Sequence, residues 1–326
     1  MHPIRLGLVG YGKIAQDQHV PAIRANPQFE LVAVATLGQH CPGVENFSSL
    51  TELLAKGPVA LVFIEDEVEI ATTLRHHLQS GFKAVAALMP DAFDLPQDVR
   101  AKVHRVPFDC GPEGAVTGAV NAVTAAAQPG CWLYYCYNAE YLFYPFCETR
   151  SVGEMLAFHT EERRDAILSY VIDLYAGDLG ACPGAVSLED AYLDKSGYYA
   201  QSRKDPETGH PRERQLDFFG GVRWRFEEHI PAPSRKIDRI SLFKAKPGLK
   251  LQQDHTFNDQ EYNTYACPWH HNLTAAVCSF RTAKALKRNP GSAFEIETFR
   301  WHNSAPFEWH SRQLLDLGLM EPGQWF

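Results

Sequence analysis

The first half of the chain alternates short apolar runs with segments of helical periodicity. Runs of about four to eight apolar residues between Gly or Pro turns predict buried strands. These runs are 4–9, 31–36, 59–64, 84–89 and 103–108. Between them, apolar residues recur at helical spacing and predict helices over 14–25, 49–55 and 68–80. This order predicts βαβ units that build a mainly parallel, doubly wound sheet in an α/β protein.

The pattern changes after Arg150. Ser151 is followed three residues later by Glu154, which predicts a capping box at the start of a helix. Residues 166–175 are apolar enough to form a buried strand, and a final helix is predicted over 272–288. Between them, residues 176–236 are polar and rich in Gly, Pro and aromatics. A loop of that length in a compact domain usually forms a lid or a binding site.

One uncharged stretch, residues 114–139, is long enough to cross a bilayer. Its small residues and the Pro129-Gly130 turn divide it, so a buried helix over 115–127 and a buried strand over 132–137 are predicted instead. We therefore expect no membrane span.

Charge and cysteine content narrow the partners and the compartment. The net charge of -8 and a pI near 6.0 disfavour binding to nucleic acid. The eight cysteines form no CxxC pair and no zinc-type spacing, and the chain opens directly on a strand pattern. These features predict a protein of the reducing cytoplasm. They say nothing about the oligomeric state.

A glycine-rich turn follows the first predicted strand and opens the first helix. In Gly10-x-Gly12-x-x-Ala15, the first glycine permits a tight turn and the second lets the backbone approach a pyrophosphate. Ala15 allows close packing of helix on strand. With IAQDQHVPAI and LVAVAT, residues 4 to about 64 resemble the start of the Gfo/Idh/MocA oxidoreductases. The resemblance implies NAD(P) binding by Gly10, Gly12 and Ala15.

The segment departs from that family at two positions. The second strand ends in Thr36-Leu37, where an acid would bind a ribose hydroxyl or an arginine a 2′-phosphate. The family also has a Glu-Lys-Pro whose lysine lies at the hydride-transfer site, and here the chain reads Leu88-Met89-Pro90. We therefore expect residues 1–58 to form a truncated Rossmann-type βαβ unit that packs without redox chemistry.

The longer remainder resembles a different family. The segment ALVFIEDEVEIATTLRHHLQSGFKAVAAL places Glu65 and Asp66 at the carboxyl end of a strand, before a helix that carries two histidines. WLYYCYNAEYLFYPF stands where bacterial family 2 glycosyltransferases have Asp-x-Asp-Glu-Phe-Leu. The resemblance covers residues 59–326 and implies a GT-A-like domain. Such a domain transfers a sugar from a nucleotide-sugar donor to an acceptor that the sequence leaves unknown.

The resemblance also implies a divalent metal, Mg or Mn, at the donor diphosphate. The alignment puts Tyr137 and Ala139 at the positions of the two aspartates, and Glu140 remains. Glu65, Asp66 and Glu140 would then lie near the donor. His255, in DHTFND, would lie near the diphosphate or the metal, so Glu140 and His255 are the metal candidates. The alternative for DHTFND is a turn whose Asp and Asn side chains bond their own backbone.

Two acidic residues are candidates for the catalytic base, because such transferases commonly take the base from this region. Asp217 and Glu228 bracket the aromatic segment FFGGVRWRF, whose Gly220-Gly221 pair could hinge a lid. Their alternative role is that of solvated surface charges. Cations that could neutralise a diphosphate are Arg223, Arg225, Lys284, Lys287 and Arg288.

These patterns predict a glycosyltransferase-like protein and leave two alternatives open. The fingerprint favours an NAD(P)-dependent sugar oxidoreductase. The loss of both aspartates favours a catalytically inactive protein that binds a nucleotide or a sugar. A junction of two gene fragments would also produce such a chain, and residues 1–58 would then be dispensable.

Overall fold

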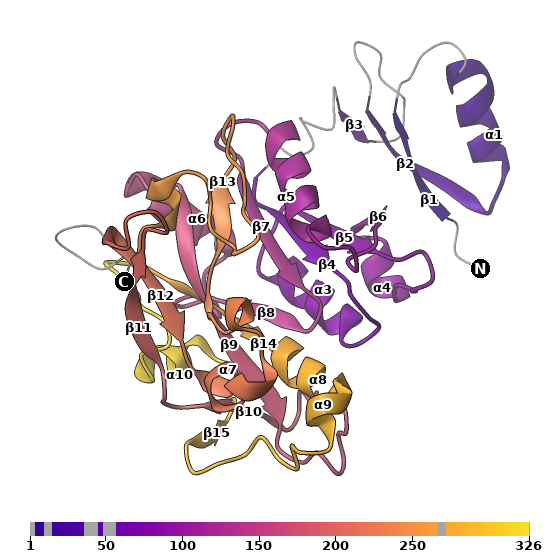
Figure 1. Ribbon diagram of the computed structural model, residues 1–326. Coiled ribbons are helices and arrows are strands. Elements are labelled where there is room, and N and C mark those ends of the chain that lie inside the picture. Colours follow the sequence, from indigo (N-terminus) through magenta and orange to yellow (C-terminus); the bar gives the residue numbers. More distant parts are fainter. Residues whose placement is uncertain (1–3, 10–14, 36–44, 48–56, 266–271, 326) are drawn as a thin grey trace.

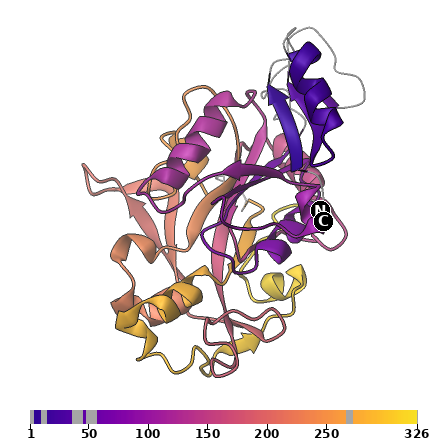
Figure 2. The ribbon, with the colours of Figure 1, turned by 90° about the vertical axis from the view of Figure 1, so that its right-hand side faces the viewer.

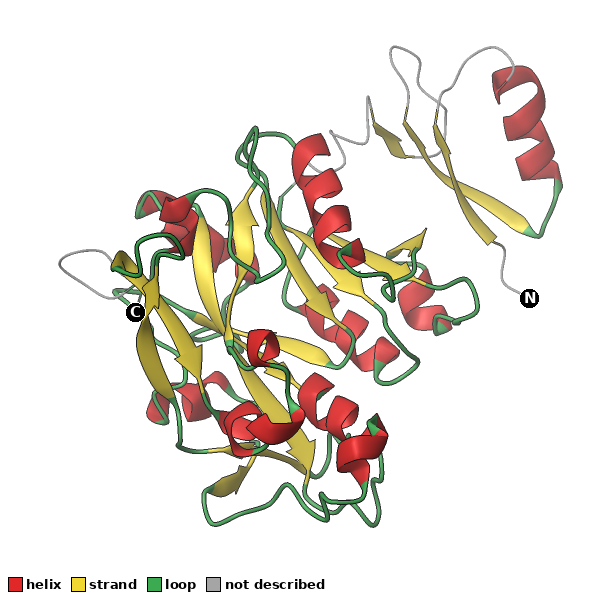
Figure 3. Cartoon of the chain, viewed as in Figure 1, coloured by secondary structure: helices red, strands yellow, loops and turns green. Residues whose placement is uncertain are grey.

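The described residues form three sheets, and helices flank the largest of them (Figures 1 and 3). The structure is a computed structural model that describes residues 4–9, 15–35, 45–47, 57–265 and 272–325. Gly10, Gly12 and the helix predicted over 49–55 lie outside the described residues.

The first sheet contains only N-terminal strands. β1 (Ile4–Val9), β2 (Phe29–Ala35) and β3 (Glu45–Phe47) pair in parallel in this order. Between β1 and β2 the chain forms η1 (Ala15–His19) and α1 (Val20–Ala25), which gives the predicted βαβ order. No described strand pairs this sheet with the large one.

The large sheet begins with a parallel half that matches the predicted βαβ pattern. Its strand order is β7-β4-β5-β6, and every neighbouring pair is parallel. The bounds are β4 (Val59–Phe63), β5 (Ala84–Met89), β6 (His104–Pro107) and β7 (Trp132–Tyr137). The prediction of a mainly parallel central sheet is confirmed here.

Helices cover both faces of this half, which explains why its central strands are apolar on both sides. Val59, Leu61 and Phe63 of β4 belong to the core beneath α5, whereas the alternate residues Ala60 and Val62 belong to the core beneath α3. Figure 2 shows α5 along one face of the strands. The helices are α3 (Ile70–Gln79), α4 (Gln97–Arg100), α5 (Ala115–Ala126) and α6 (Val152–Glu161).

The second half of the large sheet is mixed. The long strand β9 pairs antiparallel with β13 and β10, and parallel with β14. β13 is also antiparallel to β7, β14 to β8, and β10 to β15. The bounds are β8 (Glu140–Phe143), β9 (Ala166–Ala176), β10 (Ala191–Asp194), β13 (Asp238–Lys244), β14 (Ala275–Ser279) and β15 (Ser304–Pro306).

Two predictions for the C-terminal half are wrong. The helix predicted over 272–288 is strand β14 followed by the shorter helix α8 (Arg281–Arg288). The predicted long loop contains regular elements, including a separate two-stranded sheet of β11 and β12. These elements are β10, β11 (Tyr199–Lys204), β12 (Pro211–Phe219), α7 (Gly221–Arg225), η2 (Glu227–His229) and η3 (Ala232–Ser234).

The capping box predicted at Ser151 is confirmed. Ser151 and Glu154 form both hydrogen bonds of the capping box at the start of α6. The remaining elements are η4 (Gln260–Asn263), α9 (Pro290–Ala293) and α10 (Ser311–Asp316). Within the described ranges, the helices are too short or too polar to span a bilayer.

Candidate functional site: a cationic cavity at two strand ends

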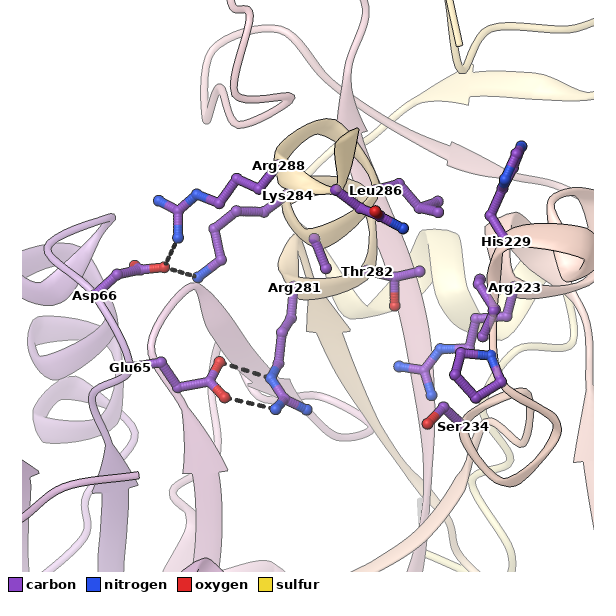
Figure 4. Close-up of a pocket in the computed structure, with 14 residues that line it drawn as sticks. Glu65, Asp66, Arg223, His229, Ser234, Arg281, Thr282, Lys284, Leu286 and Arg288 are labelled. Carbon is purple, nitrogen blue, oxygen red and sulfur yellow. Dashed lines mark hydrogen bonds and ion pairs between the residues drawn. The ribbon is translucent and has the colours of Figure 1, made fainter. Parts of the chain in front are cut away.

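A cavity of about 650 Å³ lies where the chain leaves the carboxyl ends of β4 and β14 (Figure 4). Ligands of open α/β sheets commonly bind beyond the carboxyl ends of the strands. The charged side chains that line the cavity are Glu65, Asp66, Arg223, Arg281, Lys284 and Arg288. Its volume is within the range of small-molecule sites, about 300–1,000 Å³.

The acidic wall is the turn after β4, and a buried amide fixes its shape. Asn138 is fully buried at the end of β7. Its Oδ1 accepts from the backbone N–H of Glu65 at 2.9 Å, and its Nδ2 donates to Asp66 Oδ1 at 2.7 Å and to the carbonyl of Val68 at 2.8 Å. These bonds hold both carboxylates at the cavity.

The cationic wall is one face of α8. Arg281, Lys284 and Arg288 are spaced by three and four residues, so they lie on the same side of the helix. On the opposite side Ala283 and Leu286 are buried in a hydrophobic cluster. Core packing therefore directs the three cations into the cavity.

Each of these cations meets a carboxylate of the turn. Arg281 donates two hydrogen bonds to Glu65, at 2.7 Å from Nε and 2.6 Å from Nη2. Lys284 Nζ lies 2.8 Å from Asp66 Oδ2, and Arg288 contacts the same oxygen. Tyr137 supports the arrangement, because the Arg281 guanidinium lies over its ring at 3.7 Å from the centroid.

A fourth cation reaches the cavity from the other side. Arg223 on α7 donates to Asp173 Oδ1 at 3.2 Å and to the carbonyl of Lys236 at 2.7 Å. Four cationic side chains thus line the cavity against two carboxylates, with Asp173 buried behind Arg223. The wall has an excess of positive charge.

The pKa values of the two aspartates move in opposite directions. Burial raises the pKa of Asp66, but the close ion pair with Lys284 outweighs this effect, and the net pKa lies below the usual value. Burial raises the pKa of Asp173 above its usual value, and Arg223 opposes this only in part. Asp66 is therefore ionised at neutral pH, and it forms ion pairs with Lys284 and Arg288.

Glu140, predicted beside the donor and the metal, lies in the core. It is 1% exposed, and its oxygens accept from Arg239 at 2.7 Å, from the backbone N–H of Tyr137 at 2.9 Å and from Ser279 at 3.1 Å. Burial raises the pKa of Glu140, but Arg239 outweighs this, so the net pKa is lowered. Its bonds are used inside the protein, and it does not reach the cavity.

His255, the other metal candidate, is half-buried beside Tyr135. Its Nδ1 lies 3.0 Å from the hydroxyl of Tyr135, and burial, followed by the charge of Arg239, lowers its pKa to about 3. Across the described parts of the chain, no three His, Cys, Asp or Glu side chains group to hold a metal. The predicted Mg or Mn site at Glu140 and His255 is therefore not supported.

The two base candidates pair with side chains outside the acidic turn and α8. Asp217 on β12 pairs with Arg203 at 2.7 Å and with Lys236 at 3.4 Å. Glu228 in η2 is 62% exposed beside His229. Neither lines the cavity, so their role as a base stays a prediction.

The predictions found part of the site and missed one of its central residues. Glu65 and Asp66 lie together at the cavity, as expected for acids after a buried strand, and Arg223, Lys284 and Arg288 join them. Arg281 was missed, although its spacing from Lys284 and Arg288 in RTAKALKR was a readable signal. The predicted helix over 272–288 already included Arg281, but only Lys284, Lys287 and Arg288 of this segment were named as candidate cations.

Comparison with known proteins adds one strong similarity. No protein-family model matches the chain. Over 58 residues the chain is 79% identical to galactose 1-dehydrogenase of Pseudomonas fluorescens, a match that covers 18% of this chain and 19% of the relative. The chain thus spans about a fifth of that protein's length. The match supports the oxidoreductase-type segment.

A solved structure, the D-galactose-1-dehydrogenase protein from Rhizobium etli, aligns over 81% of this chain and 83% of its own. The identity is 15% and the TM-score is 0.16, so this alignment does not indicate a shared fold.

The predicted glycosyltransferase activity is wrong. The sequence match is to a sugar dehydrogenase, and it favours the oxidoreductase alternative. The structure gives a physical reason as well, because Glu140, which was to hold the donor's metal, is bonded to Arg239 in the core. A nucleotide-sugar donor with Mg or Mn has no support.

Proposed function

We propose that the protein is an NAD(P)-dependent sugar oxidoreductase. The observation that carries this proposal is the 79% identity over 58 residues with galactose 1-dehydrogenase. Galactose is therefore the first substrate to test. When bound, the dinucleotide would accept a hydride from the sugar.

The described part of the N-terminal segment fits a dinucleotide. β1 and β2 are parallel and joined through η1 and α1, the order in which a pyrophosphate binds at the turn after the first strand. Gly10 and Gly12 follow β1 directly in the sequence, and Ala15 begins η1. In this proposal the backbone of the turn binds the pyrophosphate.

Met89 occupies a position where a lysine would be expected in an oxidoreductase of this kind. This residue ends β5 and is fully buried, where the Gfo/Idh/MocA pattern has a lysine at the hydride-transfer site. A thioether neither takes nor gives a proton, so another group would accept the proton of the sugar hydroxyl. Met89 favours a second candidate, a protein that binds a dinucleotide and a sugar without oxidising it.

The test is an assay of the full chain with NAD⁺ or NADP⁺ and galactose, read from the fluorescence of the reduced nicotinamide and, separately, from binding calorimetry. We expect Gly12→Asp to weaken dinucleotide binding at least about tenfold, or ~1.4 kcal/mol, because it places a carboxylate beside the pyrophosphate. The matched control is Gly118→Ala on α5, where no atom lies within 4 Å of an added Cβ.

Three results separate the candidates. Reduced nicotinamide that depends on galactose supports the oxidoreductase. Dinucleotide binding without reduction supports the binding protein. No dinucleotide binding, or binding that Gly12→Asp leaves unchanged, would refute both.

A further inference from the structure

We propose that the cavity at β4 and α8 binds a phosphate group, and that its ligand is a small phosphorylated sugar. The sugar part rests on the proposed function, whereas the phosphate part rests on the cavity alone. The 2′-phosphate of NADP⁺ is a second source of the same chemistry, and the experiment below separates the two.

The charges of the cavity favour an anion. Arg223, Arg281, Lys284 and Arg288 line it, and Glu65, Asp66 and the buried Asp173 behind Arg223 neutralise only part of their charge. Arg288 and Arg281 remain half-exposed, with 52% and 38% of their side-chain surface accessible. A phosphate monoester carries close to two negative charges at neutral pH, so it matches this excess better than a neutral sugar or a cation does.

Lys284 is the second indication. It is only 3% exposed, yet a buried ammonium is costly unless its protons are bound. Its Nζ lies within ion-pair distance of Asp66, but among the described residues no hydrogen bond of good geometry reaches it. An ammonium has three protons to donate. A phosphate oxygen in the cavity would accept one of them.

Arg281 is held as a phosphate-binding guanidinium would be. Two bonds to Glu65 and the ring of Tyr137 fix its plane, so little side-chain entropy remains to be lost when an anion binds. The neighbouring Thr282 lines the same cavity and adds a hydroxyl. The fixed geometry distinguishes this wall from a set of mobile surface cations.

The cavity also has room for the sugar. Its volume of about 650 Å³ is that of a small-molecule site rather than of a lone anion. Glu65 and Asp66 stand opposite α8, and carboxylate oxygens accept hydrogen bonds from hydroxyl groups. The phosphate would bind on the α8 wall and the sugar hydroxyls on the acidic turn.

The first experiment is calorimetry of the full chain with galactose 6-phosphate, galactose, inorganic phosphate, NADP⁺ and NAD⁺. We expect the sugar phosphate to bind at least about tenfold more tightly than galactose or inorganic phosphate, ~1.4 kcal/mol, and to weaken as NaCl is added. If NADP⁺ binds tenfold more tightly than NAD⁺ and the sugar phosphate binds no better than galactose, the phosphate belongs to the cofactor and the sugar phosphate is refuted.

Variants test whether the cavity is responsible. Arg288→Ala is expected to weaken the binding of the phosphorylated ligand about tenfold, and Arg288→Lys to restore part of it. Asp66→Asn is expected to tighten the binding of inorganic phosphate, because it removes a carboxylate that competes for Lys284 and Arg288. The matched control is Arg312→Ala, an 82% exposed arginine paired with Asp316 on α10, which should change nothing.

The result that overturns the inference is an affinity for inorganic phosphate that Arg288→Ala and Arg312→Ala change equally, or that Asp66→Asn lowers. This failure is distinct from failure of the proposed function. Reduction of NAD⁺ by galactose with no phosphate effect leaves the oxidoreductase standing. Phosphate binding in the cavity without any reduction leaves the cavity assignment standing.

Discussion

Two arginine–carboxylate pairs of nearly equal length occupy opposite environments in this molecule. Glu65 and Arg281 meet at 2.6 Å in the cavity wall, where 26% and 38% of their side chains are exposed. Glu140 and Arg239 meet at 2.7 Å in the core, where 1% and 5% are exposed. Both carboxylates follow or begin a buried strand, and the sequence predicts both near a donor.

The degree of burial determines whether such an ion pair can take part in ligand binding or only stabilises the fold. Water at the cavity already competes for Glu65 and Arg281, so the pair is worth little to stability and a ligand can replace one partner. Glu140 and Arg239 have no access to water, so each depends on the other. The first pair belongs to a site and the second to the fold.

The largest expected effect comes from breaking the buried pair. Glu140→Ala should lower the free energy of unfolding by about 3–5 kcal/mol, because it leaves the Arg239 charge buried without its partner. Urea denaturation followed by circular dichroism measures this loss. Glu140→Gln is the control, since it keeps the shape and part of the hydrogen bonding. A loss below about 1 kcal/mol in Glu140→Ala would contradict the comparison.

The next largest effect is expected when the pH is lowered, because the buried side chain of His159 resists protonation. Burial, followed by the charges of Arg164 and Lys244, lowers the pKa of His159 to about 3, whereas its ordinary value is 6.5. Below pH 6.5 the unfolded chain therefore binds a proton that the folded chain refuses, and stability should fall by up to about 1.4 kcal/mol per pH unit until pH 3.

His159→Phe isolates that contribution. Both ring nitrogens of His159 lack hydrogen-bond partners within the described structure, so an apolar ring should be tolerated at pH 7. Melting temperatures of the variant should decline less steeply between pH 6.5 and pH 4 than those of the unmodified chain. Parallel curves would show that His159 titrates normally in the folded protein.

The smallest effect is expected at the cavity pair. Glu65→Gln should change the free energy of unfolding by less than about 1 kcal/mol, because the pair is partly exposed. A double-mutant cycle with Arg281→Gln measures the coupling of the two side chains. A coupling as large as that of the buried pair would remove the distinction between site and core.

Local signals in the sequence predicted the parallel half of the sheet and the start of α6. The cap at Ser151 depends only on a residue three positions away, and β4 and β5 are apolar runs between turns. β14 was mistaken for helix because its five buried residues, AAVCS, form a short apolar run that either structure can bury. The error placed the expected start of the helix nine residues before that of α8 (Arg281–Arg288).

The candidate site was predictable in part for the same reason. Glu65 and Asp66 follow a strand that the sequence identifies, so their place at the sheet edge could be read. No local sequence pattern indicated that His255 would contact Tyr135, because the two residues are 120 positions apart. Nor did any local pattern show that Asp217 would pair with Arg203 on the neighbouring strand.

The strand and helix pattern of the first half, the cap at Ser151 and the N-terminal glycine fingerprint could all be read from the sequence alone. Which carboxylates line the cavity and which lie in the core depends on the tertiary structure. Glu65 pairs with Arg281, which is 216 positions away in the sequence, and Glu140 pairs with Arg239, which is 99 positions away. The free energy of a charge depends on the water and partners around it, and both are supplied by segments that only folding brings together.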